Sequence, residues 1–348
     1  MRTLALILIS AFSLASNSAL AASYQQFDGT IVDPILDVNG QVHPYSGIDL
    51  TVLATLTGAQ LSDANLSRAL LFGATLTGAA LNNANLNNAD LTGAALNNAN
   101  LNNATLSSAI LTNATLSSAE LGDATLSSAD LFGANLSSAI LTNANLINAN
   151  LTNANLNGAT LSSAILTEAS LTSANLESAT LSNAILTGAN LFGVNLFGAE
   201  LQEANLSGAD LSGADLSRAD LFSSDLLGAN LTGAVLANAD LTGADLRESN
   251  LFVALLTGTV LSGADLSGAD LSNADLFSSD LLGANLTGAV LTNAVGLGFS
   301  TGAALYDINT DFSGTGFDPV AAGWTLVPEP GTALLMSLGL AGLASRRR

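Results

Sequence analysis

Residues 81–105 read LNNAN LNNAD LTGAA LNNAN LNNAT, five units of five residues that each begin with leucine. The same spacing continues far beyond this stretch: from Leu56 to Leu291 every fifth residue is leucine, 48 in succession. The residue two places before each leucine is alanine, apart from five positions that hold another small residue. These five are Val194, Ser224, Ser249, Thr259 and Ser279.

A period of five residues fits neither an α-helix nor a flat β-strand. Five helical residues advance by about 500°, so successive leucines would scatter around the helix axis. On a strand, an odd spacing places successive leucines on opposite faces. The pattern gives one apolar interior only if the chain turns a corner after each unit. We therefore predict a solenoid whose stacked coils bury the leucine and alanine columns.

The unit A(D/N)LXX, as in Ala84-Asn85-Leu86-Asn87-Asn88, resembles the pentapeptide-repeat proteins, and the resemblance covers residues 54–295. It implies an all-β fold, a right-handed quadrilateral β-helix with four units in each coil. About 12 coils would then form a rod about 58 Å long at the spacing of neighbouring strands. In that family the central leucine and the alanine two places before it face inward, and the other three residues face outward.

Four phenylalanines recur at a constant interval, at Phe72, Phe132, Phe192 and Phe252, each twelve repeat units after the one before. Coils of four units would stack them on one line. Coils of three units would do the same, so the recurrence permits a four-sided coil without requiring one.

The second half of the repeat contains a duplication. Residues 206–236 and 261–291 are identical except that Arg218 in the first copy stands against Asn273 in the second. The copies are eleven units apart, which is not a whole number of four-unit coils, so the second copy would lie rotated by one face. The sequence therefore predicts that rod length and general surface character matter more than one constellation of residues.

The N-terminal residues have the three parts of a secretory signal peptide. Arg2 supplies a positive charge, an apolar run extends from Leu4 to Leu14, and small residues around Ala19-Leu20-Ala21 form a cleavage site. Aromatic, β-branched and proline residues concentrate on both sides of the repeat, where a solenoid needs caps over its open strand edges. We divide the chain into a signal peptide (1–22), an N-terminal cap (23–53), the β-helix (54–295), a C-terminal cap (296–326) and a sorting segment (327–348).

The sorting segment combines VPEP with an uncharged stretch from Gly331 to Ala344 and three terminal arginines. As a helix this stretch reaches about 21 Å, less than the roughly 30 Å of a hydrocarbon core. The segment resembles the PEP-CTERM sorting signal of Gram-negative bacteria, which implies recognition by an exosortase and transient membrane association through a C-terminal helix. A short permanent anchor is the alternative. The residues that carry the resemblance are Pro328, Glu329, Pro330, Arg346, Arg347 and Arg348.

Charge and composition narrow the classes of partner. The formal net charge is −21, with 28 acidic residues against 7 basic ones. Such a surface repels nucleic-acid phosphates and attracts cations, so we expect no nucleic-acid partner. A solvated acidic face that keeps the protein soluble is the simpler explanation.

Residues for catalysis are scarce. The chain has no cysteine, which excludes disulfides and thiolate metal sites, and it also lacks lysine. Its one histidine, His43, lies beside a proline in a predicted cap. Carboxylates on a convex rod wall are not in a cleft that could tune them for acid–base work. We therefore predict no enzyme, no catalytic residues and no organic cofactor.

One candidate metal site follows from a four-unit coil. Asp225, Asp245 and Asp265 would stack on one face in successive coils, about 4.8 Å apart, with Asp220 beneath Asp240. Repulsion within such a ladder could be relieved by a bridging Ca²⁺ held weakly through oxygen ligands. A repulsive but well-solvated ladder is the alternative.

Two functions remain open at this stage. An export signal, a sorting tail and a polar repeat exterior favour a secreted rod of the cell surface or exopolysaccharide matrix of a Gram-negative bacterium, reached through an inner-membrane stage. Its role would be structural or adhesive, through many weak repeated contacts. The alternative is an acidic binding protein that mimics nucleic acid, as some pentapeptide-repeat proteins do, or that sequesters divalent cations.

Overall fold

The computed structural model describes residues 24–25, 31–32, 39, 41 and 53–328. The predicted signal peptide, most of the predicted N-terminal cap and residues 329–348 of the sorting segment lie outside these residues. In the described N-terminal part, β1 (Tyr24–Gln25) pairs antiparallel with β2 (Ile31–Val32).

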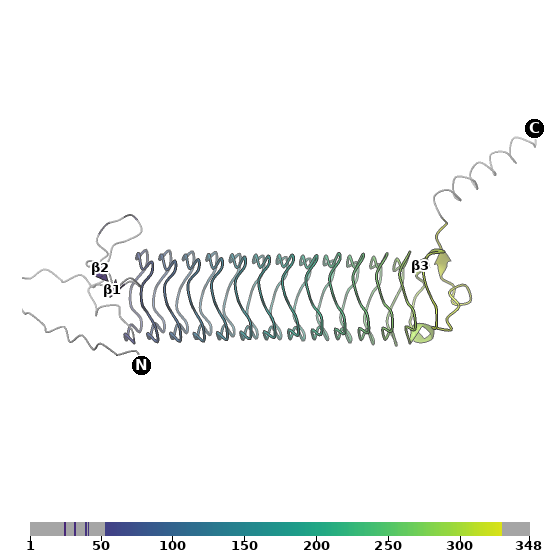
Figure 1. The fold of residues 1–348 in the computed structure, drawn as a ribbon, viewed down its shortest axis with the longest axis horizontal. Coiled ribbons are helices and arrows are strands. Elements are labelled where there is room, and N and C mark those ends of the chain that lie inside the picture. The colour runs from purple at the N-terminus through teal and green to yellow at the C-terminus, as the bar shows by residue number, and fades with distance from the viewer. Residues whose placement is uncertain (1–23, 26–30, 33–38, 40, 42–52, 329–348) are drawn as a thin grey trace, which may run out of the picture.

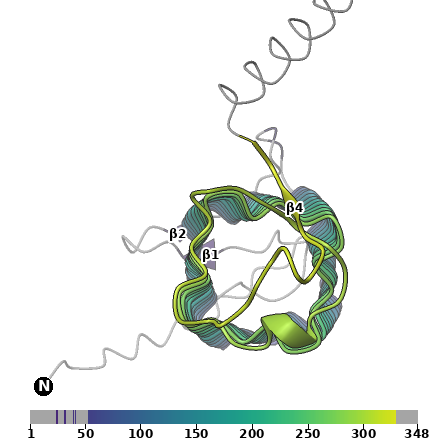
Figure 2. The same ribbon diagram turned by 90° about the vertical axis from the view of Figure 1, so that its right-hand side faces the viewer.

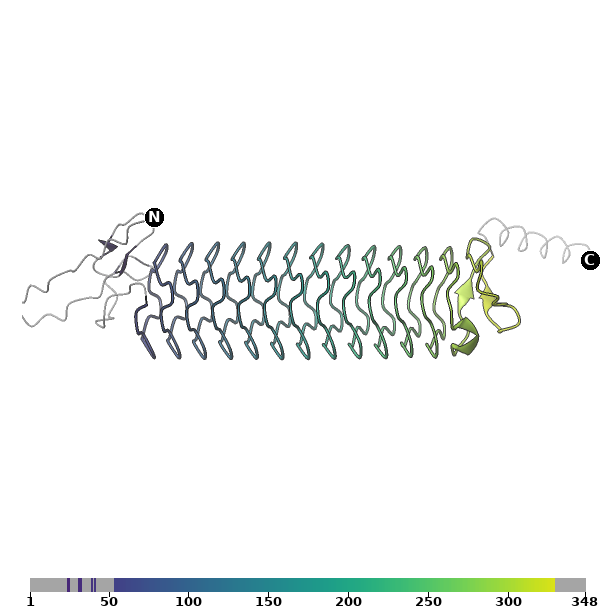
Figure 3. The same ribbon diagram turned by 60° about the horizontal axis from the view of Figure 1, so that its bottom comes forward.

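The repeat forms a rod of stacked coils, with four repeat units in each coil. Parallel bridges join equivalent positions of successive coils in an unbroken series from Thr55↔Thr75 to Asp275↔Val295. Figures 1 and 3 show the coils side by side along the rod, and Figure 2 shows them superposed in a four-cornered outline. The predicted β-helix is confirmed, and each five-residue unit forms one of the four sides of a coil.

A typical unit donates three backbone hydrogen bonds to neighbouring coils and closes one tight turn. The leucine and the residue two places after it donate to the next coil, and the residue before the leucine donates to the previous coil. The turn is closed by the following alanine, whose N–H donates to the leucine carbonyl. At Leu156 these bonds are Leu156 N to Asn175 O (2.6 Å), Gly158 N to Glu177 O (2.9 Å), Asn155 N to Ala134 O (2.9 Å) and Ala159 N to Leu156 O (2.9 Å).

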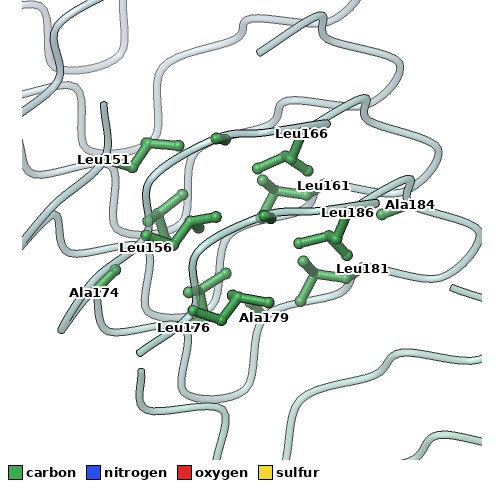
Figure 4. Close-up of a cluster of buried hydrophobic side chains, with 14 of the residues drawn as sticks. Leu151, Leu156, Leu161, Leu166, Ala174, Leu176, Ala179, Leu181, Ala184 and Leu186 are labelled. Carbon is green, nitrogen blue, oxygen red and sulfur yellow. The ribbon is translucent and has the colours of Figure 1, made fainter. Parts of the chain in front are cut away.

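The core is the column of leucines and alanines inside the rod. All leucines of the series from Leu56 to Leu291 are at most 2% exposed. Figure 4 shows leucines and alanines of successive coils, such as Leu161 and Leu181, directed into this interior. Burying one leucine side chain contributes about 1.5–3 kcal/mol, so the column is the main stabilising feature of the rod.

Four inward positions hold a hydroxyl in place of alanine, and each hydroxyl finds a backbone carbonyl. Ser224, Ser249, Thr259 and Ser279 are all at most 1% exposed. Each donates its proton over 2.7–2.8 Å, and none of the described buried side-chain polar atoms lacks a partner. The acceptors are the carbonyls of Leu221, Leu246, Leu236 and Leu276, respectively.

The residue two places after each leucine has a left-handed backbone. From Gly58 to Asn293 every such residue has a φ between 53° and 70°. Glycine, asparagine and serine fill most of these positions, because glycine and short polar residues tolerate this region best. Val253 also has this left-handed backbone, at a φ of 53°. Its side chain is β-branched, and β-branched residues tolerate this region poorly.

Asparagine or aspartate just before the leucine has a structural role in the turn. The first turn residue, directly after the leucine, donates its N–H to no backbone carbonyl in the repeat. In the coil at Asn155, the Asn155 Oδ1 accepts this N–H from Asn157 at 3.1 Å. The same bond recurs in units across the rod, for example from Phe192 to Asn190 at 3.1 Å. The (D/N) of the repeat unit is thus an Asx-turn acceptor.

The C-terminal residues continue the coil and then close it. The η1 turn (Leu297–Phe299) leads to β3 (Leu305–Tyr306), which stacks on Asn285 of the last coil and pairs in parallel with β4 (Thr325–Leu326). Four aromatic rings gather beside these strands, with centroids 4.7–5.9 Å apart; they belong to Tyr306, Phe312, Phe317 and Trp324. Trp324 is only 7% exposed.

Asp307 ties this closing segment to the last coil. Its Oδ1 accepts the Gly288 N–H at 2.8 Å, and Asn309 and Thr310 also donate to its carboxylate. Burial raises the pKa of Asp307, but these hydrogen bonds together outweigh burial and hold its pKa below the ordinary value of 3.8.

We expect Val253→Asn to stabilise the rod. Asparagine tolerates a positive φ that costs a β-branched residue about 1–2 kcal/mol, so the gain in the free energy of unfolding is about 1 kcal/mol. Thermal unfolding followed by circular dichroism measures it. The matched control is Gly193→Val, at a φ of 60° in the same turn position three coils earlier, which should destabilise. Equal melting temperatures for wild type and Val253→Asn would contradict the account.

We expect Asp307→Ala to weaken the C-terminal end by about 1–3 kcal/mol at neutral pH, because the Gly288 N–H loses its acceptor. The folded-state pKa of Asp307 is lowered, so its ionised form stabilises the protein above the ordinary value of 3.8. That contribution is lost as the pH falls through the folded-state pKa. The difference in melting temperature between wild type and Asp307→Ala should therefore narrow below about pH 4. A difference that widens in acid would refute this role.

Candidate functional site

The predicted acidic ladder is present as a stack. Parallel bridges join Asp225 to Asp245 and Asp245 to Asp265, and Asp220 to Asp240 on a second side. The three aspartates of the first stack occupy the position just before the central leucine on one side of the rod.

Each aspartate of this stack is already engaged by its own turn. Oδ1 of Asp225 accepts the Leu227 N–H at 3.0 Å, and Oδ1 of Asp265 accepts the Ser267 N–H at 3.0 Å. Asp245 accepts the Arg247 N–H in the same way at 3.1 Å. These bonds occupy one oxygen of each carboxylate and explain aspartate at this position without a metal.

Arg247 provides the ladder with a counter-charge. Its Nη2 lies 2.6 Å from Asp245 Oδ2, and its Nε donates to the same carboxylate. The side-chain hydrogen bond from Arg247 lowers the pKa of Asp245 against the opposing effect of burial. The same bond raises the pKa of Arg247, and the charges of Asp265 and Asp225 add to this shift. Arg247 therefore relieves part of the repulsion between the aspartates, a role that we predicted from the sequence for a bridging Ca²⁺.

A metal centre does not assemble among the described residues. No three His, Cys, Asp or Glu side chains of residues 24–25, 31–32, 39, 41 and 53–328 converge as a group that could hold a metal ion. A weak Ca²⁺ bridge along Asp225, Asp245 and Asp265 stays a prediction. The stacking of the three carboxylates permits such a bridge, whereas the Arg247–Asp245 ion pair reduces the repulsion that would favour it.

A small pocket lies at the C-terminal end of the rod. It has a volume of about 360 Å³ and is lined by residues that include Leu297, Phe299, Phe317 and Asp318. Asp318 is the one ionisable residue of this lining, and its Oδ1 accepts the N–H groups of Val320 and Ala321 at 3.0 and 3.1 Å. The pocket therefore brings together no nucleophile and base. His43 lies outside the described residues.

Four phenylalanines form a line along one corner of the rod. The sequence showed their regular spacing but not the corner that they share. Phe72, Phe132, Phe192 and Phe252 follow the leucine at the same corner of the rod, because twelve units make three coils of four. Their side chains are 40–52% exposed. We name this line of turn positions, from Phe72 to Thr292 with one position in each coil, the aromatic corner. Reading the sequence in rows of four units would have revealed it.

Stacked four-unit coils around a leucine column define the chain as a β-helical repeat solenoid. A family model described as pentapeptide repeats matches it in eight copies and covers most of its length, and the chain belongs to this family. The matched segments are residues 52–88, 89–127, 129–167, 149–188, 174–213, 189–227, 214–251 and 254–293. Pentapeptide-repeat proteins are generally structural or binding proteins and not enzymes.

Several solved structures are similar to this chain. HetL, a pentapeptide repeat protein involved in heterocyst differentiation regulation from the cyanobacterium Nostoc sp. strain PCC 7120, is 41% identical over 55% of this chain and 84% of its own, with a TM-score of 0.35. A pentapeptide repeat protein from the Arabidopsis thaliana thylakoid lumen is 33% identical over 26% of this chain and 63% of its own, with a TM-score of 0.26. QnrB1, a plasmid-mediated fluoroquinolone resistance protein, is 21% identical over 66% of this chain and 95% of its own, with a TM-score of 0.26. No curated protein sequence matches the chain significantly.

The tail is identified independently of the repeat. A PEP-CTERM protein-sorting motif matches residues 326–348, which confirms the resemblance seen in the sequence and implies export and recognition by an exosortase. Of the residues predicted to carry the signal, the structure describes Pro328, which is exposed; Glu329, Pro330, Arg346, Arg347 and Arg348 lie outside the described residues. Within the part of the chain that is described, no helix is long and apolar enough to cross a membrane.

The calcium prediction can be tested on the melting temperature. If Ca²⁺ bridges the ladder with a dissociation constant of about 0.1–1 mM, then about 5 mM Ca²⁺ should stabilise the protein by roughly 1–2 kcal/mol. Replacing Asp225, Asp245 and Asp265 by asparagine should remove this gain and keep the fold, because an amide Oδ1 still accepts the turn N–H. Asp210→Asn with Asp270→Asn, on another side of the rod, is the control. An unchanged melting temperature at constant ionic strength excludes the bridge.

Proposed function

We propose that the protein is an exported, non-enzymatic rod with a structural or adhesive role at the cell surface or in the exopolysaccharide matrix. The rod would be right-handed and of about 12 coils. The observation that carries the proposal is the combination of a sorting motif at residues 326–348 with a repeat solenoid over most of the remaining chain. An exosortase would be the partner during export, and the C-terminal segment would associate with the inner membrane for that stage.

The use of the outward side chains supports a structural role. Asn155 donates to Asn135, Asn175 to Asn155 and Asn195 to Asn175, a chain of amide hydrogen bonds that crosses successive coils. Aspartates of other units accept the N–H groups of their own turns, as Asp210 does from Ser212 at 3.1 Å. Much of the polar exterior thus stabilises the coil itself. This is what a long, self-supporting rod requires.

The alternative function, an acidic protein that mimics nucleic acid or sequesters divalent cations, depends on location. A nucleic-acid mimic has its targets inside the cell, whereas a sorting motif directs a chain outward. The likeness to QnrB1 is at the level of the fold, and transfers no target to this chain. A cytoplasmic pool of full-length protein would favour the alternative.

Processing of the tail tests the proposed function. In the native host, we expect the protein to be recovered outside the cell with a C-terminus near Pro328–Pro330, as measured by mass spectrometry of the terminal peptide. Deleting the exosortase should leave uncut chain in the membrane fraction. Replacing Glu329 and Pro330 by alanine should have the same effect, whereas Glu203→Ala, in the repeat, should not. Extracellular protein that still ends at Arg348 would rule out processing.

A further inference from the structure

The aromatic corner repeats with a period of three coils along the rod. In the direction of the chain its residues are Phe72, Thr92, Thr112, Phe132, Thr152, Thr172, Phe192, Ser212, Thr232, Phe252, Ser272 and Thr292. Every third coil thus presents a phenylalanine, and every coil between presents a hydroxyl. The other three corners mix polar, charged and scattered apolar residues without such a period.

This corner is also the one corner of the rod without an ionisable residue in its turns. The second turn position beside each residue of the aromatic corner holds Gly, Asn, Ser or Val from Gly73 to Asn293. Each of the other corners carries charge in its turns, for example Arg218, Glu203 and Arg247. The aromatic corner is therefore an uncharged line along a chain whose net charge is −21.

The internal duplication supplies an independent observation. The single difference between residues 206–236 and 261–291 replaces Arg218 by Asn273. Because the copies are eleven units apart, Arg218 lies at another corner, where its guanidinium lies 5.5 Å from the Phe197 ring centroid. Its counterpart Asn273 follows Ser272 and so lies at the aromatic corner. The one position that changed is a position at which an arginine would have put charge on this corner.

The four phenylalanines are partly exposed to solvent, and hydrogen bonds fix the backbone of their turns. Phe72, Phe132, Phe192 and Phe252 are 45%, 40%, 52% and 40% exposed. The N–H of Phe132 is bound by Asp130 Oδ1 at 3.1 Å, and the N–H of Phe252 by Asn250 Oδ1 at 3.0 Å. Three coils at strand spacing separate neighbouring rings by about 14 Å. The four rings therefore form a ladder of separate platforms and not one apolar patch.

The surroundings of the rings are polar. Thr112 and Ser212 donate their hydroxyl protons to Asp130 and Asp210, so their oxygens remain available as acceptors. On the side that follows the corner, the amide chain from Asn135 to Asn195 runs parallel to the rings.

We propose that the aromatic corner is a binding strip for an extended, uncharged polysaccharide. The C–H faces of sugar rings pack on aromatic rings, whose faces carry negative partial charge. Hydroxyl and amide groups between the platforms bond sugar hydroxyls. A spacing of about 14 Å, three coils, leaves room for a few sugar residues between platforms. Each contact is weak, and several on one polymer chain add up through effective concentration.

Charge and spacing distinguish this occupant from others. An anionic polymer would be repelled by the rod and by the aspartates on the side that precedes the corner, such as Asp130 and Asp210. A second copy of the rod would bring two acidic surfaces together. The contact would also consist of isolated pairs of rings, whereas a stable dimer needs a continuous apolar core. The strip rests on the proposed function for its setting, since it names the matrix component that the exported rod would contact.

The test is affinity electrophoresis of the protein recovered from its host. Native gels would contain hydroxyethylcellulose, xyloglucan, galactomannan or dextran as neutral polymers, and alginate as the anionic one. We expect retardation by at least one neutral polymer and none by alginate. The triple variant Phe132→Thr, Phe192→Thr and Phe252→Thr should bind at least about tenfold more weakly, because the contacts act together. Threonine occupies the same corner in other coils, so the variant should keep the fold.

Two further variants control this experiment. Phe222→Thr with Phe277→Thr removes rings at other corners and should leave the retardation unchanged. Phe132→Thr with Thr152→Phe keeps the number of rings but breaks their three-coil interval, and should bind more weakly than wild type.

Three results would overturn the strip: no retardation by any neutral polymer, equal loss in the Phe222/Phe277 control, or equal retardation by alginate. A triple variant that changes the sedimentation of the protein but not its retardation would instead indicate contact between copies, and would also overturn it. Any of these results with protein still recovered outside the cell leaves the proposed function standing. Protein that never leaves the cell overturns the proposed function, whatever the purified chain binds.

Discussion

Stacking of one coil on the next is the interaction on which the whole rod depends. A single unit buries one leucine and closes one turn, and its remaining backbone groups find partners only in neighbouring coils, as Leu156 does with Asn175. The leucine column and the inter-coil hydrogen bonds therefore form together or not at all. This constraint fixes the inward residues and the left-handed turn position. It leaves most of the exterior free to vary, and any function must reside there.

The exterior is less free than its polarity suggests. The residue before each leucine is a turn acceptor when it is Asp or Asn, and both serve equally through Oδ1, as Asp225 and Asn155 show. Much of the negative charge on the rod can thus arise as one of two equivalent solutions to the same backbone requirement. The Asp245–Arg247 pair then offsets repulsion where aspartates stack. Acidic composition alone is for this reason weak evidence of a cation site.

The fold could be predicted from the sequence because a leucine every five residues admits only a cornered coil. The number of corners could not, since the core pattern is the same for any number of sides; the bridge from Thr55 to Thr75 settles it. The left-handed turn position was not predicted, although glycine and asparagine recur there. The spacing of the leucines defines the core but does not show which residue of the turn has a positive φ. The ladder of Asp225, Asp245 and Asp265 was placed correctly, but its hydrogen bonds and the role of Arg247 depend on side-chain directions that spacing does not give. The predicted domain boundaries and the calcium bridge stay predictions.

In a four-sided rod, duplication of repeat units can disrupt a surface pattern that belongs to one corner. A copy displaced by eleven units keeps every leucine inside but moves each outward residue to the next side, as Phe222 and its counterpart Phe277 illustrate. Growth by such copies lengthens the rod at no cost to its core and scatters any pattern that belongs to one corner. The aromatic corner keeps its interval across this region, from Phe192 to Phe252, and the copy that enters it carries Asn273 where its twin carries Arg218. The core cannot account for this choice, because the two residues occupy the same left-handed turn position, with φ of 59° at Arg218 and 58° at Asn273. What distinguishes the two positions is the corner on which they lie, and on the proposed binding strip an arginine at position 273 would place a charge among the rings.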